Sequence, residues 1–243
     1  MAVLISLLTV IATALGGTLA LRSKDHMHLL LGLSGGLLLG LAAFDLIPEV
    51  FTINTSHLGN VPIVMVFLVV GFLILHIIER FSGAHEPAES DYGHDHEHSH
   101  GVAGIVGASA MVVHVFLDGV AVGLAFQVSK ALGVAVAIAV IAHAFTDGLN
   151  TVALLINLGS WKRTSIALIA IDGLARVSGA LLGTYITISD NFLGGYLALF
   201  AGMVIYLSTS HILPEAHSNH PSRLTLLSTV VGVVSMFLIV NWA

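Results

Sequence analysis

The chain has 243 residues, of which 56% are hydrophobic and 9% charged, and its 8 Lys and Arg stand against 14 Asp and Glu. Soluble domains carry about 25% charged residues, so this composition excludes a soluble globular protein and predicts an integral membrane protein. The net charge of -6 argues against a nucleic-acid partner, because phosphate binding needs a basic surface. The lack of cysteine excludes disulfides, iron–sulfur clusters and thiolate zinc sites.

Apolar stretches predict an all-α integral membrane protein with eight transmembrane helices. A helix needs about 20 mainly apolar residues to cross a bilayer. Such stretches cover residues 1–21, 29–51, 61–81, 102–127, 131–157, 163–187, 191–212 and 222–242. The first lacks the basic residues of a signal peptide, so we expect it to be a span. The connections are short, except for a polar histidine-rich loop at about 82–101, so residues 1–243 are expected to form a single transmembrane domain.

Basic residues near the span ends predict the orientation. If the spans alternate in direction, six basic residues fall on one side: Arg22, Lys24, Arg80, Lys162, Arg163 and Arg223. Only Lys130 falls on the other side. Cytoplasmic loops carry the excess of Lys and Arg. We therefore expect a multi-pass protein of the cell membrane (an inner membrane, given the short chain), with both termini outside and the histidine-rich loop in the cytoplasm.

Two short patterns occur twice in the chain. They are HVFLDG and HAFTDG in spans four and five, and FDLIPE and SHILPE at the ends of spans two and seven. Paired motifs in corresponding spans are typical of proteins built from inverted repeats. The pattern predicts that helices 1–3 mirror helices 6–8 around a central pair, helices 4 and 5. Pro48 and Pro214 are expected to break or kink their helices.

The repeated HxxxD pattern carries the strongest candidate metal ligands. His114 and Asp118 lie one helical turn apart on one face of span four, and His143 and Asp147 repeat this spacing on span five. Ionisable groups inside a membrane are costly unless they pair or line a polar cavity. Imidazole and carboxylate groups together suit zinc, iron, manganese or cobalt. Two matched pairs favour a metal site over simple hydrogen bonding of each His to its own Asp.

Further polar residues could extend this site. Asp172 in span six is a candidate metal ligand, although Arg176 one turn later could neutralise it as an intrahelical pair. Asn150 extends the polar face of span five by one turn. Asp45 and Glu49 share one helix face at the end of span two, and His211 and Glu215 share one at the end of span seven. These residues are either ligands along a metal pathway or interfacial groups.

The polar loop after span three is a candidate metal chelator. It places four histidines at alternate positions: His94, His96, His98 and His100. A histidine-rich tract binds metals with low specificity. We interpret the loop as a metal buffer or sensor.

Together these features resemble the Zrt/Irt-like (ZIP) family of divalent-metal transporters, of the prokaryotic type. The resemblance rests on the eight spans, the outward termini, the cytoplasmic histidine-rich loop, the two HxxxD motifs, and the LIPE and ILPE endings of spans two and seven. It implies a transporter domain over the whole chain, not an enzyme, with a transport site midway through the membrane between helices 4 and 5. By this resemblance the ligands are His114, Asp118, His143 and Asp147, with Asp172 contributing from helix 6.

Two departures from the family pattern affect the number of ions. Val115 follows the span-four histidine where many members have Asn, and Ala144 follows the span-five histidine where many have a polar or acidic ligand. The missing ligands would hold a second metal. We therefore expect one principal ion and not a binuclear centre.

The functional prediction is secondary transport of a divalent cation into the cytoplasm, with Zn²⁺ first and Fe²⁺, Mn²⁺ or Cd²⁺ also compatible. No GxxxxGK[ST] motif for ATP-driven pumping is present in the chain. The expected partners are metal ions and the lipid bilayer, and small-residue helix faces are compatible with a homodimer. Two alternatives stay open: a nickel or cobalt transporter or an exporter, and an intramembrane metal-dependent hydrolase with an activated water.

Overall fold

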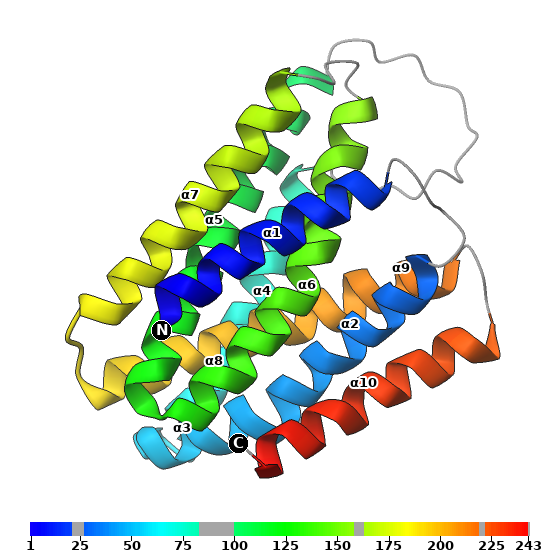
Figure 1. Cartoon of the computed structure of the whole chain (residues 1–243). Helices are drawn as coiled ribbons and strands as arrows, with labels where there is room; N and C mark the ends of the chain where they lie inside the picture. The colour runs from blue at the N-terminus through cyan, green and yellow to red at the C-terminus, as the bar shows by residue number, and fades with distance from the viewer. Residues whose placement is uncertain (21–26, 83–99, 158–162, 219–221, 243) are drawn as a thin grey trace.

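The computed structural model describes residues 1–20, 27–82, 100–157, 163–218 and 222–242, apart from some side chains within these ranges. In chain order the elements are α1 (Ala2–Ala20), α2 (Met27–Leu41), the π-helical segment η1 (Ala42–Leu46), α3 (Ile47–Ile53), the short strands β1 (His57–Leu58) and β2 (Val61–Pro62), α4 (Ile63–Ser82), α5 (His100–Val128), α6 (Lys130–Asn157), α7 (Arg163–Tyr185), α8 (Asp190–Tyr206), the π-helical segment η2 (Leu207–Ile212), α9 (Leu213–Ser218) and α10 (Arg223–Trp242). The strands form a small antiparallel hairpin. Both chain termini lie at the lower-left end of the bundle in Figure 1.

The structure confirms an all-α membrane protein. Because α2, η1 and α3 follow one another directly, as do α8, η2 and α9, the described residues form eight helical segments that coincide with the eight predicted spans to within two residues at most ends, and to within six at the end of the seventh. Five of them are long and apolar enough to cross a membrane: His28–Ile53, Met111–Val128, Ala167–Tyr185, Asp190–His217 and Arg223–Trp242. Shorter apolar helices cover Ala2–Gly16, Ile63–Ile78 and Lys130–Ala144.

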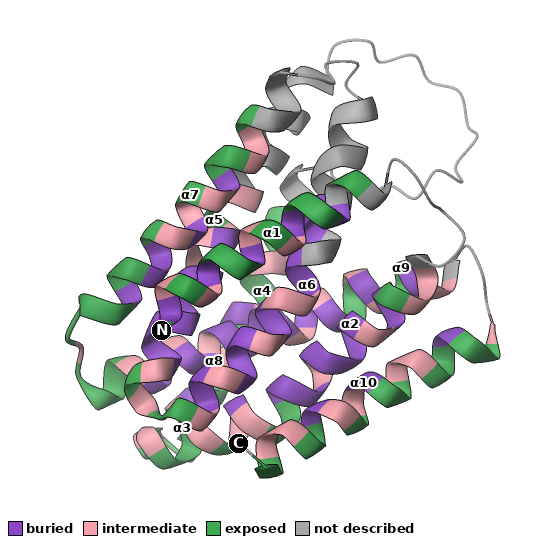
Figure 2. Ribbon diagram, viewed as in Figure 1, coloured by how far each residue is buried: buried purple, intermediate pink, exposed green. Residues whose placement is uncertain are grey.

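The outer faces of the bundle are apolar, as expected for helices that face lipid. Figure 2 shows buried residues where the helices meet and exposed residues along the outer faces of α7 and α10. The exposed side chains of α10 include Leu224, Leu227, Val230, Val234 and Phe237. Such large apolar surfaces are rare on soluble proteins, whereas they are the normal contact surface with hydrocarbon chains.

The helices that contain Pro48 and Pro214 do not break at these residues, although a break was one of the two outcomes, a break or a kink, expected from the sequence. Instead, a π-helical segment stands just before each proline. The N–H of Ile47 donates to the carbonyl of Ala42, five residues back, and the equivalent bond closes η2. Proline removes one N–H and its ring clashes with the carbonyl four residues earlier. The wider π turn changes the hydrogen-bond register there, so that the helix continues past the proline.

The helices pack mainly in four pairs: α5 with α7, α1 with α6, α10 with α2, and α4 with α8. Suppose that α1, α2 and α4 are exchanged with α7, α8 and α10, in that order, and α5 with α6. The pair α5–α7 then becomes α6–α1, and the pair α2–α10 becomes α8–α4. This pairing is what an inverted repeat around α5 and α6 (the predicted spans four and five) requires, although the repeat itself stays a prediction.

Glycine permits the close contact between α5 and α7. A Cβ atom on Gly119 would lie 2.1 Å from the carbonyl oxygen of Arg176, and one on Gly179 would lie 2.1 Å from that of Phe116. Both distances are far below a van der Waals contact, so only glycine fits. This close approach brings Arg176 of α7 next to the HxxxD motif of α5.

Candidate metal site

The two HxxxD motifs meet in the interior of the bundle. His114 and Asp118 of α5 and His143 and Asp147 of α6 each direct one ligand atom into a common space, and these atoms lie within 4.8 Å of one another. Asp118, His143 and Asp147 are buried, and the His114 side chain is 14% exposed. The helical spacing aligns each pair on one face, and the packing of α5 on α6 brings the faces together.

The shortest His–Asp contact joins the two helices. His143 Nε2 lies 2.9 Å from Asp118 Oδ2, whereas the pairs within one helix are longer, at 3.6 Å for His114 with Asp118 and 3.9 Å for His143 with Asp147. The interpretation in which each His bonds only to its own Asp therefore does not describe the geometry. The four residues form one cluster.

The orientation of His143 suits a metal ligand. Its Nδ1 lies 3.0 Å from the carbonyl oxygen of Ala139. A carbonyl only accepts, so Nδ1 donates a hydrogen to it, and Nε2, which contacts Asp118 Oδ2 at 2.9 Å, is the nitrogen on which a metal would replace a proton. Backbone carbonyls orient metal-binding histidines in this way.

Some polar atoms of the cluster make no hydrogen bond within the described residues, although they are buried. These atoms are His114 Nε2 and Asp118 Oδ1. Burying a polar atom without a partner is costly, so such atoms require an explanation. An imidazole nitrogen and a carboxylate oxygen are the donor types that divalent transition metals take.

Arg176 of α7 completes the cluster, with a partner that the sequence did not indicate. Its Nη2 lies 2.9 Å from Asp147 Oδ2 and 3.7 Å from Asp118 Oδ2, and the side chain is 2% exposed. The ion pairs of the described residues include none between Arg176 and Asp172. Of the two roles considered for Asp172 from the sequence, the ion pair within α7 is thus not formed among the described residues, and the guanidinium contacts carboxylates of α5 and α6 instead.

Asp172 is the fifth candidate ligand, and it lies beside the cluster. It is buried, its Oδ1 accepts no hydrogen bond from the described residues, and it is not one of the four residues whose ligand atoms converge. Its carboxylate is close enough to Asp147 and Arg176 to interact with both electrostatically. It therefore belongs to the charge balance of the site.

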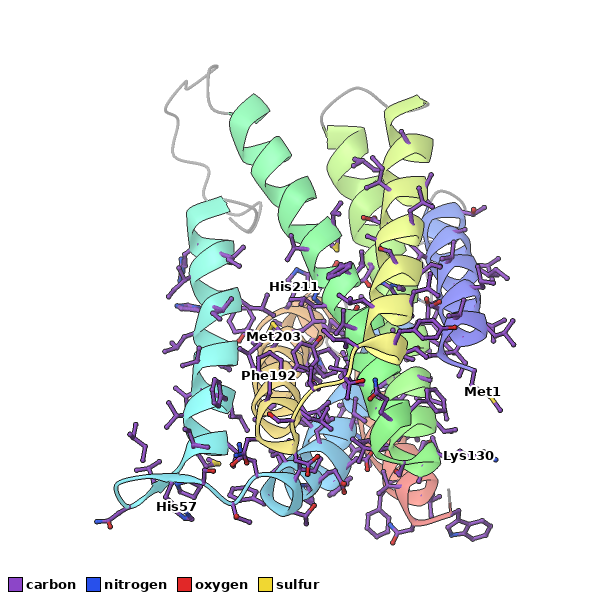
Figure 3. The ribbon with its side chains drawn as sticks, turned by 90° about the vertical axis from the view of Figure 1, so that its left-hand side faces the viewer. Met1, His57, Lys130, Phe192, Met203 and His211 are labelled. Atoms are coloured by element: carbon purple, nitrogen blue, oxygen red, sulfur yellow. The ribbon has the colours of Figure 1, made fainter. Side chains whose placement is uncertain are left out.

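The remaining candidates lie elsewhere or outside the described residues. Asp45 and Glu49 belong to η1 and α3, and His211 and Glu215 to η2 and α9. His211 Nδ1 lies 3.9 Å from Glu215 Oε2, and Figure 3 shows His211 far from His57 at the hairpin end of the bundle. None of these residues belongs to the four-residue cluster.

Several predicted ligands are not placed by the structure. The loop histidines His94, His96 and His98 lie outside the described residues, and the side chains of His100 and Asn150 are likewise not described. The loop chelator therefore stays a prediction.

Tyr196 was not expected near the site. Its hydroxyl donates to the carbonyl oxygen of Leu117 over 2.8 Å, which ties α8 to α5 next to Asp118. Neither this contact nor the position of Arg176 could be recognised from spacing within one helix, because both cross a helix interface.

A bundle of apolar helices around a buried His/Asp cluster defines a helical membrane protein of the metal-transporter class. A family model described as ZIP Zinc transporter matches residues 82–240, more than half of the chain. The chain therefore belongs to the ZIP zinc-transporter family.

Individual relatives agree with this assignment. "Zinc transporter SLC39A7" of Homo sapiens is 30% identical over 151 residues, which cover 58% of this chain and 32% of the relative. "Zinc transporter foi" of Drosophila melanogaster is 28% identical over 123 residues, covering 51% of this chain and 17% of the relative. The chain thus spans a third or less of the length of these animal relatives. "Zinc transporter ZupT" of Corynebacterium aurimucosum is 25% identical over 245 residues, covering 95% of this chain and 92% of the relative.

Proposed function

We propose that the chain is a secondary transporter that carries a divalent cation, zinc first, across the membrane into the cytoplasm. The observation that supports this most strongly is the convergence of His114, Asp118, His143 and Asp147 within 4.8 Å. Charged groups buried between transmembrane helices are expensive and mark ion pathways. In this proposal the cluster is the transport site.

Zinc is the preferred substrate because of the donors and the relatives. Two imidazole nitrogens and two carboxylate oxygens complete the four-coordinate site that zinc adopts most readily. The relatives described above are all named zinc transporters. Fe²⁺, Mn²⁺ and Cd²⁺ accept the same donors and are the next candidates, and Val115 and Ala144 beside the ligands favour a single ion.

The alternatives receive less support. An intramembrane hydrolase needs an open coordination position and a general base. Here the carboxylates of Asp118 and Asp147 lie against histidine and arginine, and the relatives carry the names of transporters. A nickel or cobalt transporter, or an exporter, uses similar donors and is separated from the proposal by measuring flux of each metal in each direction.

The test is zinc uptake into proteoliposomes that contain a fluorescent zinc indicator. We expect the wild type to take up zinc. We expect uptake by His143→Ala and Asp147→Ala to be more than about tenfold lower, since even the residues that hydrogen-bond to metal ligands contribute about 10–100-fold. Each variant is first checked for a monodisperse elution profile.

The matched controls are His57→Ala and Asp190→Ala, which alter the same residue types at exposed positions outside the cluster. Both should transport like the wild type. Normal uptake by His143→Ala and Asp147→Ala would show that the cluster is structural and that the ion takes another path. No zinc flux by the wild type would overturn the proposed function.

A homodimer and the orientation belong to the same proposal. The particle mass of the purified protein in detergent decides the oligomeric state. The orientation is testable by chemical labelling of introduced cysteines.

A further inference from the structure

We propose that Arg176 is a built-in competitor of the transported cation, which shares the carboxylates of Asp118 and Asp147 with the ion and thereby weakens its binding. This inference rests on the proposed function, because it concerns the same site. It assigns a role to a residue that supplies no ligand atom to a metal.

The contacts of Arg176 are those of a cation in the site. Its guanidinium lies 2.9 Å from Asp147 Oδ2 and 3.7 Å from Asp118 Oδ2, and each carboxylate is also one of the four candidate ligands. An ion that binds to these oxygen atoms must take over part of their charge from the guanidinium. The attraction is large because the groups are buried, where water screens charges weakly.

The position of Arg176 is fixed by the backbone. Gly119 follows the ligand Asp118 directly in the sequence. A Cβ atom on Gly119 would lie only 2.1 Å from the carbonyl oxygen of Arg176. The packing of α7 on α5 therefore holds the guanidinium within reach of the cluster. A freely moving surface arginine would not compete in this way.

Charge arithmetic favours a role for Asp172 as the second partner of Arg176. Asp118, Asp147 and Asp172 carry three negative charges, and Arg176 together with one divalent ion carries three positive charges. Buried charges are tolerated when they are balanced. With Asp118 and Asp147 bound to the ion, only Asp172 is left to balance the guanidinium.

The geometry allows this exchange. Asp172 stands four residues before Arg176 on α7, hence on the same face and one turn away. Its buried Oδ1 makes no hydrogen bond within the described residues, and neither does the buried Nη1 of Arg176. Ion binding then moves Arg176 from Asp147 toward Asp172, and ion release reverses the movement. A transporter gains from this arrangement, because an ion that is bound too tightly is not released.

The test is the zinc dissociation constant of the purified full-length protein in detergent, measured by titration calorimetry. Arg176→Met removes the charge and keeps the length of the side chain, and we expect zinc to bind about tenfold more tightly, since coupling between close buried charges reaches this size. Arg176→Lys keeps the charge without the planar fork that reaches two carboxylates. Its dissociation constant should lie between those of the wild type and Arg176→Met. If Arg176→Met fails to fold, the Lys variant alone decides.

Asp172→Asn separates a balancing role from a role as metal ligand. We expect this change to weaken zinc binding more in the wild-type background than when combined with Arg176→Met. Equal weakening in both backgrounds would assign Asp172 as a direct ligand and overturn the exchange.

Zinc binding by these variants distinguishes a failure of the proposed transport site from a failure of the competition by Arg176. If His143→Ala and Asp147→Ala leave zinc binding unchanged, the site itself is wrongly assigned. If both abolish binding while the Met and Lys variants of Arg176 bind zinc like the wild type, only the competition fails.

Discussion

Asp118 joins the two helices of the site and the arginine of a third. Its Oδ2 lies 2.9 Å from His143, 3.6 Å from His114 and 3.7 Å from Arg176. A single carboxylate oxygen thus faces two imidazole nitrogens and a guanidinium. At the scale of single residues, Asp118 therefore contributes both to the charge balance of the cluster and to ion binding.

This position predicts the effect of Asp118→Asn, which keeps the shape of the side chain and removes its charge. Zinc at 100 times its dissociation constant should stabilise the wild type by about 2.7 kcal/mol, because it binds only the folded protein. We expect this stabilisation to disappear in Asp118→Asn and to persist in Asp190→Asn, where the altered carboxylate is exposed. Thermal unfolding with and without zinc measures both. A zinc-stabilised Asp118→Asn protein would contradict a central role for this carboxylate.

Between helices, the contact of α5 with α7 decides where Arg176 lies. The sequence predicts that His114, Asp118, His143 and Asp147 share faces of neighbouring helices, because spacing within a helix determines which side chains lie together. It does not predict which helices meet at a glycine, and so it offered Asp172 as a partner for Arg176 but not Asp118 or Asp147. It also predicted a break or a kink at Pro48 and Pro214, since propensity alone does not show the π turns that accommodate these prolines.

The glycine contact leads to a prediction for Gly119→Ala. The added methyl group would stand 2.1 Å from the α7 backbone, which cannot move without separating the helices. We expect destabilisation of about 1–3 kcal/mol, the usual cost of overpacking, together with altered zinc affinity as Arg176 moves away from Asp147.

Gly173→Ala is the matched control on α7, because its added methyl group meets a valine side chain at 3.1 Å instead of backbone. It should cost less, and it should leave the zinc affinity unchanged. Thermal unfolding followed by circular dichroism gives the comparison. Equal unfolding temperatures for the two variants would show that the short distance between α5 and α7 does not determine the stability of the protein.

For the whole molecule, fold class follows from composition and apolar stretches, since a helix that faces lipid must be apolar along its length. The described helical segments match the predicted spans for this reason. The direction of the molecule in the membrane is a separate matter, because it depends on where the few basic residues lie. His57 and Lys130 lie toward the same end of the bundle in Figure 3. Arg80 lies near the end of α4 that is far from the hairpin. This helix has 20 residues and is therefore about 30 Å long, at 1.5 Å per residue.

The orientation can be measured directly, because the chain contains no cysteine. A single cysteine introduced as His57→Cys, Lys130→Cys or Arg80→Cys is then the only reactive thiol. With both termini outside, a membrane-impermeant maleimide on intact cells should label His57→Cys and Lys130→Cys and leave Arg80→Cys unlabelled until the cells are permeabilised. Each variant must retain zinc uptake, so that only folded protein is scored. The reverse labelling pattern would place the basic ends of the helices outside, and inward transport would then have to be reassigned as export or established by flux alone.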